Sequence, residues 1–134
     1  MAAVLIVVVL AIGYSFIRTW LLLPESYAAW TTGNLMVEYL QTHTNQWSHG
    51  WEDLRSATNS LQEKGMPVFV PLDQLPHFVK IDWRVDVGHL QQVAHSSSNV
   101  TIHVITRLDG SPLRAVVGPD TEPNNKIIRY LQKP

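Results

Sequence analysis

Residues 1–23 read MAAVLIVVVLAIGYSFIRTWLLL, and Pro24 follows them directly. Arg18 carries the only charged side chain in this stretch. A helix rises about 1.5 Å per residue, so a helix over residues 2–23 is roughly 33 Å long and spans a hydrocarbon core of about 30 Å. Because residues 4–12 are apolar on every side of such a helix, lipid suits them better than water. We therefore predict that residues 1–23 are a transmembrane anchor.

The side chains of this anchor have two predicted roles. Arg18 lies near the downstream end, where its long side chain can reach the headgroups, and Trp20 suits the aromatic belt at the membrane surface. The remaining anchor residues are predicted to face lipid: Val4, Leu5, Ile6, Val7, Val8, Val9, Leu10, Ile12 and Phe16. The predicted location is therefore the membrane, with a single crossing.

A cleavable signal peptide is the main alternative for this segment. Ser26 and Ala28 place small residues at the spacing of a signal-peptidase site just after Pro24. The long apolar run, the absence of basic residues before it and the position of Arg18 favour an anchor. Arg18 on the carboxy-terminal side favours a cytoplasmic domain, but long domains cross membranes largely regardless of their charge. We predict an extracytoplasmic domain.

About 110 residues follow the anchor, which is the size of one domain, so we predict a single small domain over residues 24–134. The chain has 10 Lys and Arg against 11 Asp and Glu, and its net charge is −1. These charges are mixed along the sequence, a pattern that does not indicate a nucleic-acid partner. The chain has no cysteine, which excludes disulfides, iron–sulfur clusters and thiol catalysis.

Two amphipathic helices are predicted after the anchor. The first covers residues 26–43, where apolar residues share one stripe, and Gly33 marks either a break or the close approach of another backbone. The second begins near Ser48, a suitable cap, and ends at Gly65. Three prolines between residues 66 and 78 predict an extended connection with a brief edge strand over residues 68–70.

The remainder of the chain predicts strands. Residues 79–87 and 100–108 alternate between apolar and polar, with a polar connection between them. Asp109 and Gly110 predict a hairpin turn into a third strand over residues 113–117. Asn124 is the predicted cap of a last short helix. The predicted fold class is α+β, with amphipathic helices packed on a three- to four-stranded antiparallel sheet.

This order of elements resembles the outline of type IV pilins and secretion pseudopilins. In that family an apolar helix meets a proline, runs into an amphipathic helix and precedes an antiparallel sheet, and the resemblance implies a filament subunit. The family's basic leader and early glutamate have no counterpart here, because Glu25 is the first acidic residue. Residues 33–40, with Trp47 and residues 51–54, also resemble a segment of small uncharacterised membrane-anchored bacterial proteins, which implies no activity.

Candidate catalytic residues are few. The six histidines (43, 49, 77, 89, 95 and 103) include no i,i+4 pair with a glutamate between, so the sequence predicts neither a metal nor a cofactor. Asp82 and Asp86 share the polar face of their predicted strand, and His103 can lie opposite them, which would allow a carboxylate–histidine site. A solvated sheet face explains the same pattern. No nucleophile elbow or phosphate loop occurs, so we predict a protein that is not an enzyme.

Large aromatic residues are concentrated just after the anchor. They can form the core of a small domain, because tryptophan buries a large area, or a docking surface, because exposed Trp and Tyr dominate the energetics of interfaces. On the second interpretation, the residues predicted to bind protein are Trp30, Met36, Tyr39, Trp47 and Trp51.

The predicted function is that of a membrane-anchored, protein-binding accessory or structural subunit of a membrane complex. Its predicted partners are other membrane-complex or envelope proteins, further copies of the chain, and the bilayer itself through the anchor. Two alternatives are a pilin-like filament subunit and a membrane-tethered hydrolase or metal-dependent enzyme.

Overall fold

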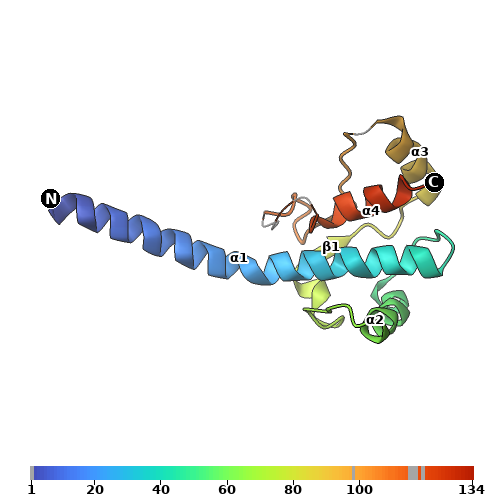
Figure 1. Ribbon diagram of the computed structural model, residues 1–134, viewed down its shortest axis with the longest axis horizontal. Helices are drawn as coiled ribbons and strands as arrows, with labels where there is room; N and C mark the ends of the chain where they lie inside the picture. The colour runs from blue at the N-terminus through green and yellow to red at the C-terminus, as the bar shows by residue number, and fades with distance from the viewer. Residues whose placement is uncertain (1, 98, 115–117, 119) are drawn as a thin grey trace.

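The computed structural model of the chain describes residues 2–97, 99–114, 118 and 120–134 (Figure 1). Its elements, in chain order, are α1 (Ala2–Thr42), η1 (Trp51–Asp53), α2 (Leu54–Glu63), η2 (Leu75–His77), β1 (Val79–Ile81), α3 (Val87–Ser96), β2 (Ile105–Arg107) and α4 (Pro123–Leu131). The described part of the chain is mostly helical, with one antiparallel sheet of two strands. Figure 1 shows the second half of α1 running between α4 and α2.

The helix α1 is continuous over 41 residues and contains Pro24. The prediction that one helix closes at Pro24 and another begins at residue 26 was therefore wrong. A proline costs a helix one backbone hydrogen bond and crowds the preceding turn, which bends the axis. Figure 1 shows a shallow change of direction in the light-blue part of α1. Packing of the second half of α1 against α2 and α4 outweighs that local loss.

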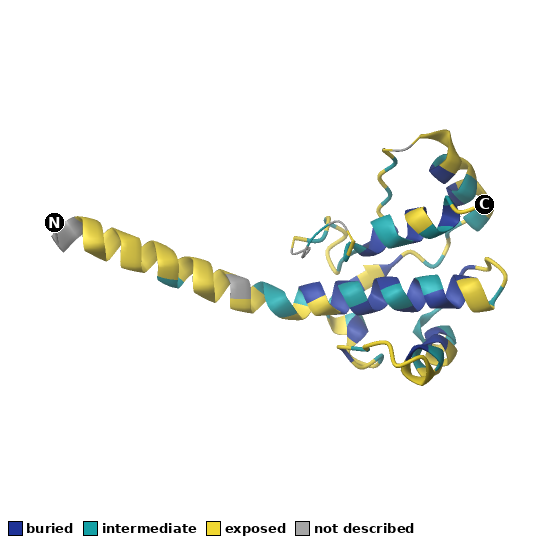
Figure 2. Cartoon of the chain, viewed as in Figure 1, coloured by how far each residue is buried: buried dark blue, intermediate teal, exposed yellow. Residues whose placement is uncertain are grey.

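The core surrounds the second half of α1, which is dark blue in Figure 2. It is built from apolar side chains of nearly every element, namely Leu35, Met36 and Leu40 of α1, Leu54 and Leu61 of α2, Leu75 of η2, Val79 and Ile81 of β1, Leu90 of α3, Ile105 of β2, and Ile127 and Leu131 of α4. Gly33 allows α4 to approach, because a Cβ there would lie 2.8 Å from the Cα of Pro123. Of the two interpretations of Gly33, the close approach is therefore the correct one.

The sheet is smaller than predicted. Val79 pairs with Arg107 and Ile81 with Ile105, and no third strand occurs among the described residues. Residues 79–87 do alternate in exposure, but the ladder ends at Ile81. There the Asp82 carboxylate accepts a hydrogen bond from the Arg84 backbone N–H (3.0 Å), which turns the chain.

The other predicted strands also differ from the structure. Residues 68–70 and 100–104 form no strand, and residues 115–117 of the predicted third strand lie outside the described residues. The hairpin turn itself is present, because the Gly110 N–H donates to the Arg107 carbonyl and the Arg107 N–H donates to the Ser111 carbonyl, both at 2.9 Å. The predictions of the alternating residues and of the turn at Gly110 were therefore correct, whereas the predicted length and number of paired strands were wrong.

The helix ends and caps were predicted in part. Gly65 ends α2 with a φ of +69°, as predicted, and the next N–H reaches back to the Leu61 carbonyl (2.9 Å). The cap of α4 is Glu122, which accepts from the Asn125 N–H (2.6 Å), and not Asn124. The helix α3 was missed and had been predicted as a polar connection. Its signal was Asp86, whose carboxylate accepts from the first-turn N–H groups.

Candidate functional site

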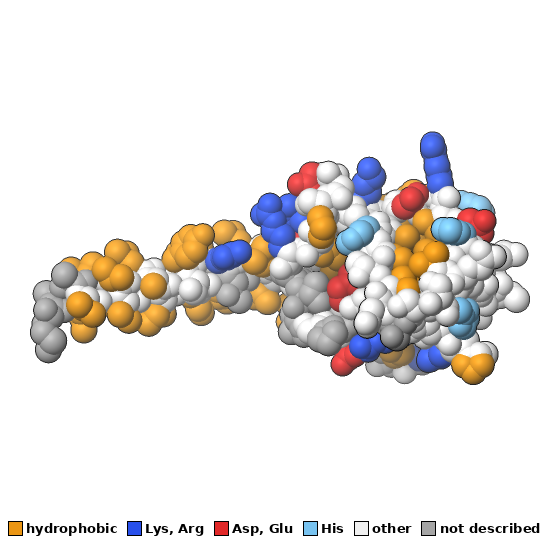
Figure 3. Space-filling view, turned by 90° about the horizontal axis from the view of Figure 1, so that it is seen from above, with side chains coloured by type: hydrophobic (Ala, Val, Ile, Leu, Met, Phe, Trp, Pro, Cys, Tyr) orange, Lys and Arg blue, Asp and Glu red, His pale blue; other side chains and the backbone are white. Residues whose placement is uncertain are grey.

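The first half of α1 projects from the domain and is exposed on all sides (Figures 2 and 3). Its described large apolar side chains from Val4 to Leu21 are 49% to 74% exposed, including those predicted to face lipid. Trp20 is also exposed and contacts the ring of Phe16 at 6.2 Å between centroids. Among the described residues, α1 is the one helix long and apolar enough to cross a membrane. None of the residues in its most apolar stretch is buried in the domain.

This exposed surface is costly in water. Burying one large apolar side chain contributes about 1.5–3 kcal/mol, and no part of the described domain covers the projecting residues. Exposed apolar surface on this scale indicates contact with lipid or with other apolar helices. The charge of Arg18 stands on the same projecting segment and is exposed.

Three of the five residues predicted to bind protein belong to the core. Met36, Tyr39 and Trp47 are 0%, 7% and 6% exposed, and the indole N–H of Trp47 donates to the Asp82 carbonyl (2.8 Å). The prediction that these three side chains form a docking surface was therefore wrong. They belong to the core, which was the other interpretation. Trp30 and Trp51 remain partly exposed.

A single line of residues along the second half of α1 is not fully buried. Between Ser26 and Gln41 every residue is buried except five, spaced alternately by three and four: Tyr27, Trp30, Asn34, Val37 and Gln41. We call these five residues the α1 stripe. That spacing keeps side chains on one face of a helix, so α1 is buried on its other sides and only partly covered along this face. The ring of Phe69 lies against Tyr27 and Trp30, at 5.2 Å and 4.7 Å between ring centroids.

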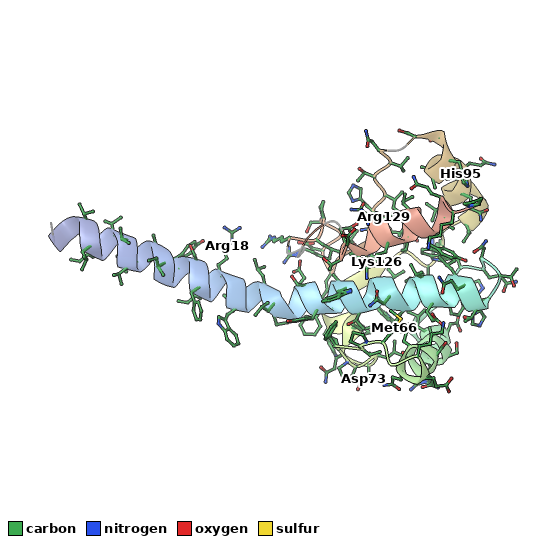
Figure 4. All side chains as sticks on the ribbon, in the orientation of Figure 1. Arg18, Met66, Asp73, His95, Lys126 and Arg129 are labelled. Carbon is green, nitrogen blue, oxygen red and sulfur yellow. The ribbon has the colours of Figure 1, made fainter. Side chains whose placement is uncertain are left out.

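A hollow of about 260 Å³ lies over the carboxy-terminal part of the α1 stripe, from Asn34 to Gln41. Its floor is α1, one wall is the carboxy-terminal end of α2, and the other wall is α4. The lining residues are Asn34, Val37, Glu38 and Gln41, then Leu61 and Met66, then Lys126, Arg129, Tyr130 and Lys133. Figure 4 places Lys126 and Arg129 on the α4 side of α1 and Met66 on the opposite side. We call this hollow the α1 groove.

Basic side chains concentrate around the α1 groove although the whole chain has a net charge of −1. The ammonium of Lys126 lies 5.6 Å from the ring centre of Trp30 and donates to the side-chain oxygen of Asn34. Burial lowers the pKa of Lys126 below its usual range. Arg129 pairs with Asp120, whereas no described group pairs with Lys133. The groove therefore presents cations beside apolar surface.

Glu38 lines the groove, and two side chains hold it: Ser60 of α2 and Lys64, which directly follows α2. Its carboxylate, with 4% of the side chain exposed, accepts from the Lys64 ammonium (2.6 Å) and the Ser60 hydroxyl (2.5 Å). Burial alone would raise the pKa of Glu38, but those hydrogen bonds and the charge of Lys64 hold the pKa below its usual range. The pair fastens α2 to α1.

Removing Lys64 is therefore expected to destabilise the domain in a pH-dependent way. Lys64→Met leaves the Glu38 carboxylate buried without its cation, and we expect the free energy of unfolding at pH 7 to fall by about 1–3 kcal/mol, since Lys64 is itself half exposed. The pKa of Glu38 is lower in the folded chain than in the unfolded chain. The pair therefore contributes fully to the free energy of unfolding at a pH above the unfolded pKa, and this contribution is lost as the pH falls through the folded pKa. Urea unfolding of the detergent-solubilised chain at pH 7 and pH 3.5 measures both effects. Lys80→Met, at an exposed lysine of β1, is the matched control, and equal losses in the two variants would contradict the assignment.

The residues of the predicted carboxylate–histidine site are only partly brought together. Asp82 and His103 line one surface hollow, but no described interaction joins them. The Asp82 carboxylate accepts from Arg84, and the Asp86 carboxylate caps α3. Among the described residues, no group of three His, Cys, Asp or Glu is placed to hold a metal ion. Among the described residues around Asp82 and His103, no base is hydrogen-bonded to a nucleophile.

An ion pair near Pro24 was missed from the sequence. The guanidinium of Arg107 donates to the Glu25 carboxylate at 3.1 Å, and the backbone N–H of Arg114 donates to the same carboxylate at 3.0 Å. The two charged residues lie 82 positions apart, so spacing gave no signal. The pair ties the end of β2 to α1 just beyond Pro24, at the point where the helix leaves the domain.

No protein family, no curated protein and no solved structure matches the chain. The pilin-like outline therefore stays a prediction. The projecting half of α1 and the α1 stripe are the two features of the described chain that bear on function.

Proposed function

We propose that the protein is a single-pass membrane protein whose small domain binds other proteins, as an accessory or structural subunit of a membrane complex. One observation carries the proposal. The apolar half of α1 stands exposed on all sides, yet it is continuous with the helix at the centre of the core. Lipid covers such a segment without any change in the domain, and its length of roughly 33 Å over residues 2–23 suits a bilayer.

The position of Ala28 supports retention of this segment. Cleavage after Ala28 would cut α1 at a residue with 0% exposure, inside the helix that the core packs around. It would also remove Glu25, so the domain would lose the ion pair between Glu25 and Arg107 (3.1 Å). We therefore propose an uncleaved anchor. An extracytoplasmic domain stays part of the proposal, because domains of this length cross membranes largely regardless of charge.

A filament subunit is the second candidate. The observation that favours it is a long helix whose first half is exposed and apolar and whose second half packs in the domain. Filament subunits of this outline are processed at the amino terminus before assembly. The intact mass of the purified chain separates the two candidates, since a retained Met1 would count against the filament.

The test is purification of the tagged full-length chain from native membranes in mild detergent. We expect the chain to resist an alkaline wash of the membranes and to elute with a second protein in a fixed ratio. Light scattering during gel filtration measures the mass of the assembly. A monomer that elutes alone would overturn the proposal, and a ladder of self-oligomers without a second protein would favour the filament.

A further inference from the structure

The exposed large apolar side chains of the domain gather where α1 leaves it. Beyond Pro24, four such side chains of the described chain are 41% to 54% exposed: Tyr27, Met66, Phe69 and Leu108. Three of them lie at this end, because Phe69 contacts Tyr27 at 5.2 Å between ring centroids and Leu108 lines a surface hollow together with Glu25. Figure 1 shows the segment after α2 and the segment after β2 on either side of α1 there.

Positive charge lies at the same end of the domain. The backbone N–H of Arg114 donates to the Glu25 carboxylate (3.0 Å), which places Arg114 beside α1, and its side chain is exposed. Glu25 is already paired with Arg107, and no described carboxylate forms an ion pair with Arg114 or with Arg18 on the projecting segment. Figure 3 shows basic side chains where the projecting helix meets the domain. We call Tyr27, Phe69, Leu108 and Arg114 the exit face.

The rise of α1 gives the depth of the exit face in a bilayer. The apolar run ends at Leu23, and Glu25 and Tyr27 follow it by about 3 Å and 6 Å along the helix. The headgroup layer on each side of the hydrocarbon core is about 5–7 Å deep. With the run ending at the edge of the hydrocarbon, Glu25 and Tyr27 therefore lie within the headgroups, and Phe69 lies at their outer edge.

This depth selects lipid as the occupant of the exit face. The face adjoins the anchor itself, so a bilayer that holds the anchor must meet it. Its chemistry suits that layer, because tyrosine and other amphipathic side chains favour the membrane surface and guanidinium groups bind phosphate through two parallel hydrogen bonds. The long side chain of Arg18 reaches the same layer from below.

Resting on the proposed membrane anchor, we infer that the exit face is a lipid-binding surface that sits in the headgroup layer. Leu108 and Phe69 insert at the boundary with the hydrocarbon, and the guanidinium groups of Arg18 and Arg114 bind the phosphates of anionic phospholipids. The domain therefore rests on the bilayer and does not stand clear of it on a stalk.

Depth can be measured with single cysteines, because the chain has none of its own. The full chain is reconstituted in vesicles of equal parts phosphatidylcholine and phosphatidylglycerol, with a fluorophore on Phe69→Cys or Leu108→Cys. The controls are Met66→Cys, which lines the α1 groove far from Leu23, and Gln46→Cys, exposed after α1. We expect acrylamide in the water to quench the two exit-face labels about threefold less than the controls, since the headgroup layer shields them. Neither exit-face side chain belongs to the described core, so both variants should fold.

A label on Phe16→Cys, within the apolar segment, tests the anchor in the same vesicles. If the Phe16 label is shielded while either the Leu108 or the Phe69 label is quenched as strongly as the controls, this inference fails alone. If the Phe16 label is also open to acrylamide, the proposed anchor fails with it. Equal shielding of the control labels would overturn the inference too, because the domain would then not meet the bilayer through the exit face.

The two arginines are tested by the choice of lipid. A nitroxide on the phosphatidylglycerol headgroup should quench the Leu108 label about fivefold more than one on phosphatidylcholine, a factor that corresponds to about 1 kcal/mol for an arginine at an anionic surface. Arg18→Gln combined with Arg114→Gln should abolish this preference. Arg84→Gln is the control, because Arg84 is exposed and follows Trp83, which contacts Trp51 of η1. Equal quenching by the two lipids in the wild type would overturn the binding of anionic phosphate.

Discussion

Two aspartates in the apolar half of α1 will keep the chain out of the membrane. Val9→Asp combined with Ile12→Asp places two carboxylates near the centre of the span, where each costs about 2.5–3.5 kcal/mol. The sum of about 5–7 kcal/mol lowers insertion by a factor of more than about a thousand. Both side chains are about two-thirds exposed and form no part of the described core, so the domain should fold as before.

Flotation in a density gradient measures this effect, since membranes rise and aggregates sink. The wild-type chain should float, and the double aspartate variant should stay at the bottom or in the soluble fraction. Val9→Leu combined with Ile12→Leu is the matched control and should float with the wild type. If the aspartate variant floated equally, the apolar segment would not be inserted in lipid, and the proposed anchor would be lost.

Removing the side chain of Asn124 should cause the largest loss of stability in the domain. Its carboxamide oxygen accepts from the backbone N–H groups of Val104 (3.0 Å) and Ile105 (2.9 Å), and its amide group donates to the Ile105 carbonyl (2.9 Å). Asn124 is 5% exposed, so Asn124→Ala leaves three backbone groups without partners and away from water. At about 1–3 kcal/mol for each unsatisfied group, we expect a loss of about 3–5 kcal/mol in the free energy of unfolding.

Chemical unfolding of the detergent-solubilised chain measures that loss. Asn125→Ala is the matched control, because Asn125 bonds to Glu122 only through its backbone N–H, which the substitution keeps. The control should change the free energy of unfolding by less than about 0.5 kcal/mol. A similar small change in Asn124→Ala would mean that water reaches the backbone of β2 in solution.

Patterns that depend on a single element were readable from the sequence. The apolar run, the end of α2 at Gly65 and the turn at Gly110 all follow from local chemistry and are confirmed in the structure. The strand over residues 79–87 failed for a physical reason. Alternation reports which side chains face inward, and that alternation is present, but a strand also needs a partner of equal length, which β2 does not supply.

The candidate site was predicted least well, because it depends on which face of α1 the domain covers. Both faces of the helix carry apolar residues, so the sequence could not show that Met36 and Tyr39 are buried while Trp30 and Val37 are only partly buried. The positions of α2 and α4 decide this, and those are tertiary properties.

Because α1 is continuous through Pro24, a change in the tilt of its first half also moves its second half and the domain packed around it. Transmembrane helices change their tilt to match the thickness of the bilayer around them. Since Gln41 lies roughly 27 Å beyond Leu23, a change of about 10° in tilt swings the far end of the domain sideways by about 5 Å. With the proposed anchor in a bilayer, lipid composition would therefore set the direction in which the domain stands relative to the membrane.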